Sequence, residues 1–386
     1  MGPPNQDIIN YSAASTPPLT PLSRPHKDSI PTETDDTFSL TDRRTTELLE
    51  FPFRTTDYTL DKKNLLGSGL WSDVFLALPI IPKLSTAHSD IEIDVLGTLS
   101  PPLTPVKARN TSNSIPSIPQ AYAIKLPAMT SAKAVIASEA RILSHLSSFS
   151  SYSDHIVPFF GLDTRNGALI MSAMPNNLNA FVKNLNTLDA TSRTARIVQE
   201  FPKLALNLVR GLEWLNTHNV IHADIKPDNI LLTKSGMPVF ADFSSSILTI
   251  TSDELGASST APVGGGTWDY LCPSILTRDS STARYPTPST STDLYSLAIT
   301  LLFVVIGHSP LDSAGSNTFR RRDMVKQGTP LAFAFGGDKG NVAEQRCKDL
   351  STTLGWDVVA WLQGGLRKSE SRVGVREWRE SLERRM

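Results

Sequence analysis

The segment Ile221–Leu232 limits the possible folds of this chain more than any other, because it sets polar side chains between apolar ones. It reads IHADIKPDNILL, so a histidine, an aspartate, a lysine and an asparagine fall within eight positions. The apolar residues on both sides favour burial, and a simple surface turn would not need them. The segment therefore predicts a loop that its surroundings hold rigidly for chemistry.

The residues that follow extend this pattern toward a metal site. An apolar strand at residues 239–244, VFADFS, contains Asp242. Asn229 and Asp242 offer hard oxygen ligands that suit Mg²⁺, an ion that takes few protein oxygens together with phosphate oxygens. Asp224 is left as a base or an orienting group for an attacking hydroxyl. These three side chains predict a site where a metal ion and a hydroxyl nucleophile meet.

Two segments nearer the N-terminus give weaker signals. Residues 67–74, GSGLWSDV, fall between two expected strands, and glycines there let backbone N–H groups approach phosphate. No Lys-Ser/Thr pair follows at the Walker A spacing, and two glycines in a turn are usually only a turn. Lys125 ends an apolar strand expected at residues 121–126, which is an ordinary place for a solvated lysine. Glu139, on a helix expected at residues 131–146, can turn inward to meet it.

The order of expected elements predicts the fold class. Strands are expected around residues 59–78, 121–126 and 168–174, whereas an amphipathic helix is expected at residues 202–218 and mostly helices and loops follow it. A strand-rich part that precedes a helix-rich part is the α+β pattern of two lobes.

Taken together, these motifs resemble a eukaryotic protein kinase of the serine/threonine type over residues 57–384. LGSGLWSDV, AIK, Glu139, HADIKPDN and DFS occur in the order of that family. LIMSAM at residues 169–174, GTWDYLCPS at 266–274 and STDLYSLA at 291–298 add further matches.

The resemblance implies a bilobal protein-kinase-like fold of class α+β. A small β-rich N-lobe is expected at about residues 57–174, and a larger helical C-lobe at about residues 175–384.

The resemblance also implies roles for the site residues. Asp224 is expected to orient the substrate hydroxyl and accept its proton, and Lys226 to neutralise the transferring phosphoryl group. Lys125, paired with Glu139, is expected to hold the phosphates of ATP. Asn229 and Asp242 are expected to bind Mg²⁺. The remaining contacts to the nucleotide are expected from Leu66, Gly67, Ser68, Gly69, Val74, Ala123, Met171 and Leu231.

A supporting set of residues follows from the same resemblance. Leu143, His222 and Phe243 are expected to stack as a hydrophobic spine between the lobes. Asp293 is expected to brace the catalytic loop from below.

Four positions depart from the family pattern. Ser72 replaces a loop glycine, and Ser244 replaces the glycine of the metal-binding triad. Ala223 replaces the arginine that receives a phosphate from the activation segment, so we hypothesise activity without phosphorylation of that segment. Ser274 replaces the glutamate that would pair with Arg372, so we expect this arginine to find another acceptor.

Two functions stay open at this point. One is an active serine/threonine protein kinase that uses ATP and Mg²⁺, which the five groups that touch phosphate, metal or nucleophile support. The alternative is a pseudokinase, a scaffold that binds nucleotide or partner proteins without turnover. The four substitutions and the proline-rich segments support the alternative.

Residues 1–50 and an insert at residues 79–120 are rich in Ser, Thr and Pro and lack a sustained apolar period. Such segments cannot bury enough surface to offset their ordering entropy, so we expect a disordered tail and a disordered insert. The pentapeptide PPLTP occurs at residues 17–21 and again at residues 101–105. Both copies are either extended linkers or phosphorylated sites that bind a partner.

The charge balance limits the partners. The chain has 37 Lys+Arg against 38 Asp+Glu, a formal net charge of -1. A protein that coats nucleic acid or an anionic membrane needs a cationic excess. The longest apolar run, residues 297–306, falls short of the ~20 residues that cross a bilayer. We expect an intracellular monomer, in the cytoplasm, the nucleus or both, with protein substrates and no nucleic-acid or membrane partner.

Overall fold

The computed structural model describes most of the chain after its first 46 residues. The described ranges are residues 47–80, 118–249, 268–277 and 285–386. All of them belong to one compact unit, Thr46–Met386. The expectations for residues 1–46, for most of the insert and for both PPLTP copies lie outside the described residues.

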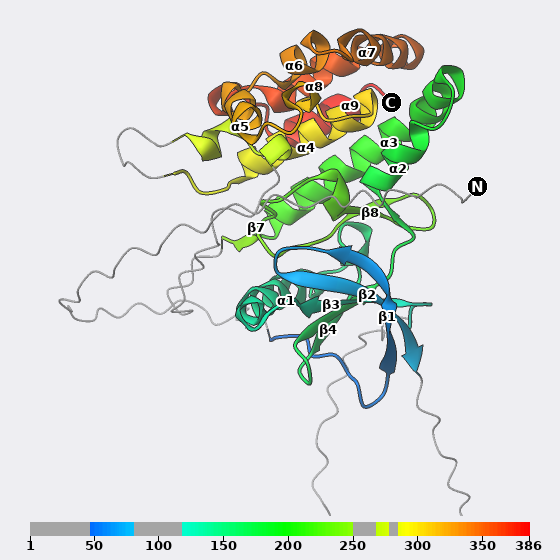
Figure 1. Cartoon of the computed structure of the whole chain (residues 1–386), viewed down its shortest axis with the longest axis vertical. Helices are drawn as coiled ribbons and strands as arrows, with labels where there is room; N and C mark the ends of the chain where they lie inside the picture. Colours follow the sequence, from blue (N-terminus) through cyan, green and yellow to red (C-terminus); the bar gives the residue numbers. More distant parts are fainter. Residues whose placement is uncertain (1–46, 81–117, 250–267, 278–284) are drawn as a thin grey trace, which may run out of the picture. The chain divides into compact units, whose positions relative to one another are not determined.

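The N-terminal part is an antiparallel sheet of five strands in the order β1-β2-β3-β5-β4 (Figure 1). Its strands are β1 (Asp57–Ser68), β2 (Ser72–Ile80), β3 (Tyr122–Pro127), β4 (Phe159–Asp163) and β5 (Ala168–Ser172). Helix α1 (Lys133–Ser147) contacts β3, β4 and β5.

The central strand β3 shows how the sequence orients the site. Side chains alternate between the faces of a strand, so Tyr122 and Ile124 share one face and Ala123 and Lys125 share the other. Tyr122 and Ile124 belong to a small apolar cluster with Phe51. Lys125 therefore points to the opposite face of the sheet.

The C-terminal part is mainly helical (Figure 1). Its helices are α2 (Leu178–Leu185), α3 (Ala190–Thr217), α4 (Thr290–Ile306), α5 (Thr318–Gln327), α6 (Pro330–Gly336), α7 (Gly340–Leu354), α8 (Val358–Leu366) and α9 (Val375–Glu383). Short strands lie among them: β6 (Asn176–Asn177), β7 (Val220–Ile221), β8 (Ile230–Leu232), β9 (Pro238–Phe240) and β10 (Ile247–Leu248).

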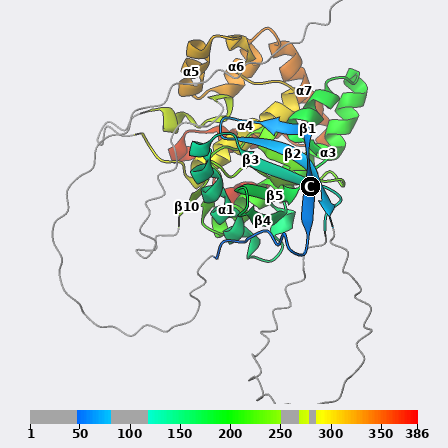
Figure 2. The same cartoon turned by 60° about the horizontal axis from the view of Figure 1, so that its bottom comes forward.

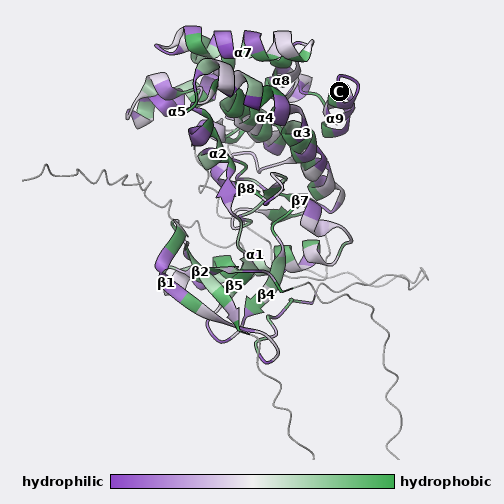
Figure 3. Cartoon of the chain, turned by 90° about the vertical axis from the view of Figure 1, so that its right-hand side faces the viewer, coloured by the Kyte–Doolittle hydropathy of each residue, from purple (hydrophilic) through white to green (hydrophobic). Residues whose placement is uncertain are grey.

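Helix α4 is the central helix of this part. Every residue from Thr292 to Ile306 is buried, and colouring by hydropathy shows a mostly apolar helix (Figure 3). A helix that is apolar all round requires burial on all sides. The apolar run at residues 297–306 is thus the core of α4. None of the helices in the described ranges is both long and apolar enough to cross a membrane.

Several boundaries differ from the sequence-based expectation. The helix expected at residues 202–218 is only the second part of α3, which begins at Ala190. The Asp189 side chain accepts a hydrogen bond of 3.0 Å from the Ser192 N–H and so caps this earlier start. Pro202 lies inside the helix.

The folded domain also begins before the expected residue 57. Glu50, which the prediction placed in a disordered tail of residues 1–50, forms a bridge with Leu162 of β4, and Phe51, just after that tail, is 3% exposed. Strand β2 continues to Ile80, so the insert expected at residues 79–120 begins later than predicted.

Candidate functional site

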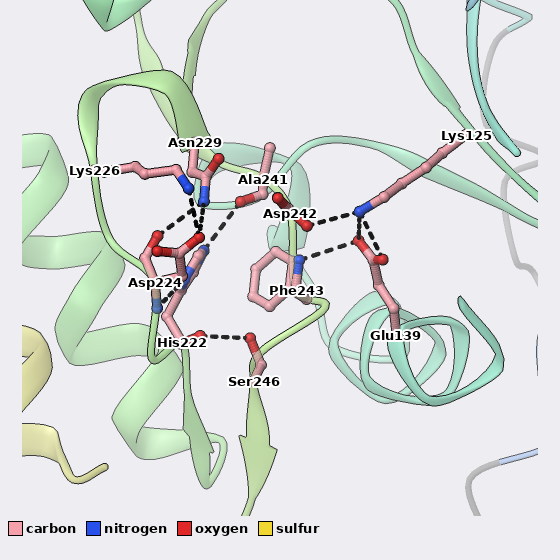
Figure 4. Close-up of polar contacts among 10 residues, drawn as sticks. All are labelled: Lys125, Glu139, His222, Asp224, Lys226, Asn229, Ala241, Asp242, Phe243 and Ser246. Carbon is pink, nitrogen blue, oxygen red and sulfur yellow. Dashed lines mark hydrogen bonds and ion pairs between the residues drawn. The ribbon is translucent and has the colours of Figure 1, made fainter. Parts of the chain in front are cut away.

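Lys125 joins three elements at the centre of the site (Figure 4). Its Nζ lies 2.7 and 2.9 Å from the two carboxylate oxygens of Glu139 on α1, and 2.7 Å from Oδ1 of Asp242 after β9. Lys125 is 4% exposed and Glu139 is fully buried. The inward turn of Glu139 puts a charged residue on the buried side of α1, where only a paired charge is tolerated.

The charges in this cluster stabilise one another. Burial by itself would lower the pKa of Lys125, but the Asp242 and Glu139 carboxylates outweigh it and raise that pKa. Burial likewise favours a higher pKa for Asp242, yet Lys125 and a hydrogen bond from Ser244 hold it well below its usual range. Burial raises the pKa of Glu139, against the opposing effect of Lys125. Lys125 and Asp242 are therefore both charged at neutral pH.

Asp242 and Phe243 direct their side chains to opposite sides of the chain. Asp242 adopts a left-handed conformation, φ 62°, and the Phe243 N–H donates to Oε1 of Glu139 at 3.1 Å. The Phe243 ring is buried and packs on the His222 ring, with centroids 4.8 Å apart. Leu143 is also fully buried in the same core. This arrangement leaves the Asp242 carboxylate facing Lys125.

The catalytic-loop candidates form a second polar cluster. Oδ2 of Asp224 accepts from Lys226 Nζ at 2.8 Å and from Asn229 Nδ2 at 2.9 Å. The same Asn229 amide also donates to the Asp224 carbonyl, and Ala241 N–H donates to the Asn229 carbonyl at 2.9 Å. Burial raises the pKa of Asp224, while Lys226 opposes that rise. Backbone pairing thus places Asn229 beside the residue that precedes Asp242.

His222 supports this loop as a neutral ring. Its Nε2–H donates to the Ala241 carbonyl at 3.1 Å, and its Nδ1 accepts from the Asp224 N–H at 3.4 Å. Those two bonds require the neutral tautomer with the proton on Nε2. Burial lowers the pKa of His222 to about 4, which agrees with that tautomer.

Asp293 holds the loop from α4, in the contact that the resemblance implied. Its two oxygens accept the His222 N–H at 2.7 Å and the Ala223 N–H at 2.9 Å. Burial raises the pKa of Asp293 to about 7, against the two N–H donors. Ala223 has φ 63°, a left-handed conformation that costs energy in a residue with a Cβ. The carboxylate of Asp293 is positioned to stabilise this turn.

The expected nucleotide-binding residues fall into two groups. Val74, Ala123 and Met171 are neighbours across β2, β3 and β5, since Val74 pairs with Lys125 and Ala123 pairs with Met171. Leu231 lies apart from them on β8. Leu66, Gly67 and Ser68 are the last residues of β1, and Gly69 follows in the turn to β2, where its N–H donates to the Ser72 carbonyl at 2.8 Å. No hydrogen bond between described residues joins this turn to the Lys125 cluster.

A contact that the sequence did not reveal fixes the start of the activation segment. Ser246 is buried, and its hydroxyl donates to the His222 carbonyl at 2.9 Å. The next residues form β10, which pairs with β7 immediately before the catalytic loop. A serine in a run of three serines carries no signal for such a contact, because the acceptor is a distant backbone carbonyl.

The expectation that Arg372 finds other acceptors, because Ser274 replaces its glutamate partner, is confirmed. Its guanidinium donates to the Ser291 carbonyl, to the Ser291 hydroxyl at 2.9 Å and to the Arg367 carbonyl at 2.8 Å. It also lies 3.4 Å from the sulfur of Cys272 and over the ring of Tyr295. Neutral acceptors have taken the place of the ion pair.

The family assignment rests on the whole of this arrangement and on a direct comparison. Residues 117–354 match the family model described as the protein kinase domain. This match covers more than half of the chain, and the chain therefore belongs to the protein kinase family. The predicted family and the predicted bilobal α+β fold are confirmed.

Individual relatives are similar over shorter regions. The mitogen-activated protein kinase kinase mkk2 of Aspergillus fumigatus is 29% identical over 178 residues, which cover 45% of this chain and 32% of that protein. The MAP kinase kinase skh1/pek1 of Schizosaccharomyces pombe is 35% identical over 114 residues, 30% of this chain and 28% of that protein. The serine/threonine-protein kinase PknA of Nostoc is 28% identical over 176 residues, 45% of this chain and 28% of that protein. The matched regions thus span about a third or less of these relatives.

Proposed function

We propose that this chain transfers the γ-phosphoryl group of ATP to serine and threonine hydroxyls of protein substrates. The observation that carries the proposal is the joint contact of Lys125 with Glu139 and Asp242, while Glu139 also accepts the Phe243 N–H. This connected set orients the phosphate-binding lysine and the metal-binding aspartate from three separate elements. Relatives that are named serine/threonine-protein kinases support the choice of hydroxyl.

The residues fit a magnesium ion that binds together with ATP. Asp242 is held in its charged form, which is the form that ligates metal. The Asn229 amide nitrogen donates to Asp224, so its other terminal atom is the oxygen that Mg²⁺ prefers. Asn229 and Asp242 would hold the ion, which when bound neutralises negative charge on the phosphates.

The other residues act on the phosphates and on the hydroxyl. Lys125, fixed by Glu139, would bind the α- and β-phosphates. Asp224 would orient the incoming hydroxyl and accept its proton, and burial, by raising the pKa of Asp224, makes it a better acceptor than an exposed carboxylate. Lys226, 2.8 Å from Asp224, would face the phosphoryl group as it moves.

We further propose that activity needs no phosphate on the activation segment. Ala223 cannot receive one, whereas the β10–β7 pairing and the Ser246 hydroxyl hold the start of that segment without a charge. Backbone pairing therefore supplies the order that an arginine–phosphate contact would give.

The test is a transfer assay with labelled Mg-ATP and a generic basic protein. The full chain is expected to transfer label, before and after phosphatase treatment, and Asp224→Asn is expected to lower the rate by about 10²–10⁴-fold. The control is Asn207→Ala on α3, which removes an exposed amide outside the site and is expected to leave the transfer rate unchanged. Thermal stabilisation by nucleotide with no transfer would instead identify the scaffold function.

A further inference from the structure

A short segment before the first strand crosses the end of the sheet and touches α1 (Figures 1 and 2). We call residues 48–51 the N-terminal strap. Its backbone pairs with β4: Leu162 N–H donates to the Leu49 carbonyl, and Phe51 N–H donates to the Leu162 carbonyl, each at 2.9 Å. The strap therefore adds a short parallel partner to the edge of the sheet.

The strap is also bonded to the helix that carries Glu139. Leu49 N–H donates to the Ser144 hydroxyl at 2.9 Å, and that hydroxyl donates to the Ala140 carbonyl at 2.7 Å. Ala140 is the residue next to Glu139. Leu48 packs against the main hydrophobic core, and Phe51 is 3% exposed. One segment thus connects the sheet edge with the C-terminal part of α1.

The sheet is shaped to receive the strap at one glycine. Gly161 has φ 128°, and a Cβ at this position would lie 2.5 Å from the Phe51 nitrogen and 2.6 Å from the Glu50 carbonyl carbon. Separations under 3.0 Å do not occur for real side chains, so any other residue would push the strap away. The register of β4 against β5 is irregular at this same place.

We propose that the N-terminal strap is a positioning element that holds α1 where Glu139 reaches Lys125. Lys125 on β3 and Glu139 on α1 lie 2.7 Å apart, so a shift of α1 away from the sheet would break this ion pair. The strap forms hydrogen bonds with both the sheet and α1, and its contact on α1, Ser144, lies within two helical turns of Glu139. This proposal rests on the proposed function, because it assigns the strap a role in holding the phosphate-binding lysine.

The test compares variants that remove the strap contact with variants that leave it. Removal of residues 1–46 leaves the strap, and Ser147→Ala removes a hydroxyl of α1 that has no hydrogen-bond partner within the described residues. Both are expected to match the full chain in Mg-ATP affinity and in hydrogen exchange of α1. Ser144→Ala is expected to weaken Mg-ATP binding by about 2- to 10-fold, the usual effect of one lost hydrogen bond, and to speed exchange in α1. Ser144→Thr, which keeps the hydroxyl, is expected to restore both.

Removal of residues 1–51 provides the larger perturbation, and its effect on nucleotide affinity should exceed that of Ser144→Ala. A lower unfolding temperature with unchanged Mg-ATP affinity and unchanged α1 exchange, in both variants, would show a merely structural role and overturn the proposal. Neither readout needs turnover. A full chain that transfers no phosphate therefore contradicts the proposed function, whereas the strap is judged on binding and exchange.

Discussion

The two ends of the activation segment satisfy a nearby cation in different ways. At its start, Asp242 and Glu139 both contact Lys125, so a charge meets opposite charges. At its end, Ser274 stands where the family has a glutamate, and Arg372 bonds the carbonyls of Ser291 and Arg367 instead. This chain thus has the ion pairs of Lys125, but it lacks the ion pair of Arg372 with a glutamate at position 274.

This difference distinguishes Lys125, whose charge the proposed reaction uses, from Arg372, whose charge only needs acceptors in the packed structure. Carbonyl groups satisfy the donors of an arginine nearly as well as a carboxylate does, because the net gain of a buried ion pair over its desolvation is small. A carbonyl does not replace Asp242 or Glu139 in the proposed function, because the buried lysine that would bind phosphate is kept charged by these two carboxylates. The retained pair is the one that the proposed reaction uses.

The largest effect is expected from removing the cation at the start of the segment. Lys125→Met leaves the buried carboxylate of Glu139 and the partly exposed carboxylate of Asp242 without their cation, so we expect the free energy of unfolding to fall by about 3–5 kcal/mol. Phosphate transfer should become undetectable, because the nucleotide loses its phosphate contact. Chemical denaturation and the transfer assay measure the two effects.

The matched control for this variant changes a lysine outside the cluster. Lys234→Met, at an exposed position, should leave both quantities within about 0.5 kcal/mol and twofold of the unchanged chain. Equal stability of the Lys125 and Lys234 variants would show that Glu139 and Asp242 tolerate the loss of their cation, and the contrast between the two ends would fail.

A second prediction concerns the pH dependence of stability near Asp293 and His222. The pKa of His222 is lowered to about 4 in the folded protein against 6.5 for an ordinary histidine, so the unfolded chain binds a proton that the folded chain refuses. The contribution of His222 to stability should therefore fall as the pH drops from about 6.5 to about 4, by up to about 3 kcal/mol. Asp293 acts in the opposite sense, because its raised pKa removes stability as the pH rises toward about 7.

Comparing the acid loss of stability between the unchanged chain and a His222→Phe variant separates the effect of His222 from that of Asp293 and the other groups. His222→Phe keeps a ring against Phe243 but cannot take up a proton. Denaturation curves of both chains at pH 4.5 and pH 7 should show a smaller acid loss for the variant. The same acid loss in both would mean that His222 is charged in the folded state.

Much of the chemistry was predictable because each motif combines polar groups with neighbours that fix their environment. The contact of Lys125 with Glu139 was predicted from a strand and the amphipathic helix after it, and the contact of Asp293 with the catalytic loop was implied by the family resemblance. The site roles themselves stay predictions until turnover is measured. The predicted start of α3 was wrong, since its cap at Asp189 lies thirteen residues before residue 202, where the helix was expected to begin.

The strap and the acceptors of Arg372 were out of reach of the sequence for another reason. Leu49, Ser144 and Gly161 are far apart in the chain and belong to no pattern, and each is an ordinary residue by itself. Backbone carbonyls such as those of Ser291 and Arg367 are present at every residue, so their role depends on tertiary position alone. The sequence shows that a side chain such as Arg372 needs acceptors, but it does not show which backbone carbonyls supply them.

The smallest predicted effect restores the missing charge at the end of the segment. Ser274→Glu offers Arg372 the carboxylate of the family pattern, yet its donors are already satisfied, so the free energy of unfolding should change by less than about 1 kcal/mol. Arg372→Met should instead lose about 1–2 kcal/mol, because it leaves the Ser291 and Arg367 carbonyls without their donor. Denaturation of the two variants and of the double variant measures these values. A gain of 3 kcal/mol or more from Ser274→Glu, in the range of a strongly coupled buried pair, would show that Arg372 is poorly satisfied and that the two ends of the segment obey the same rule.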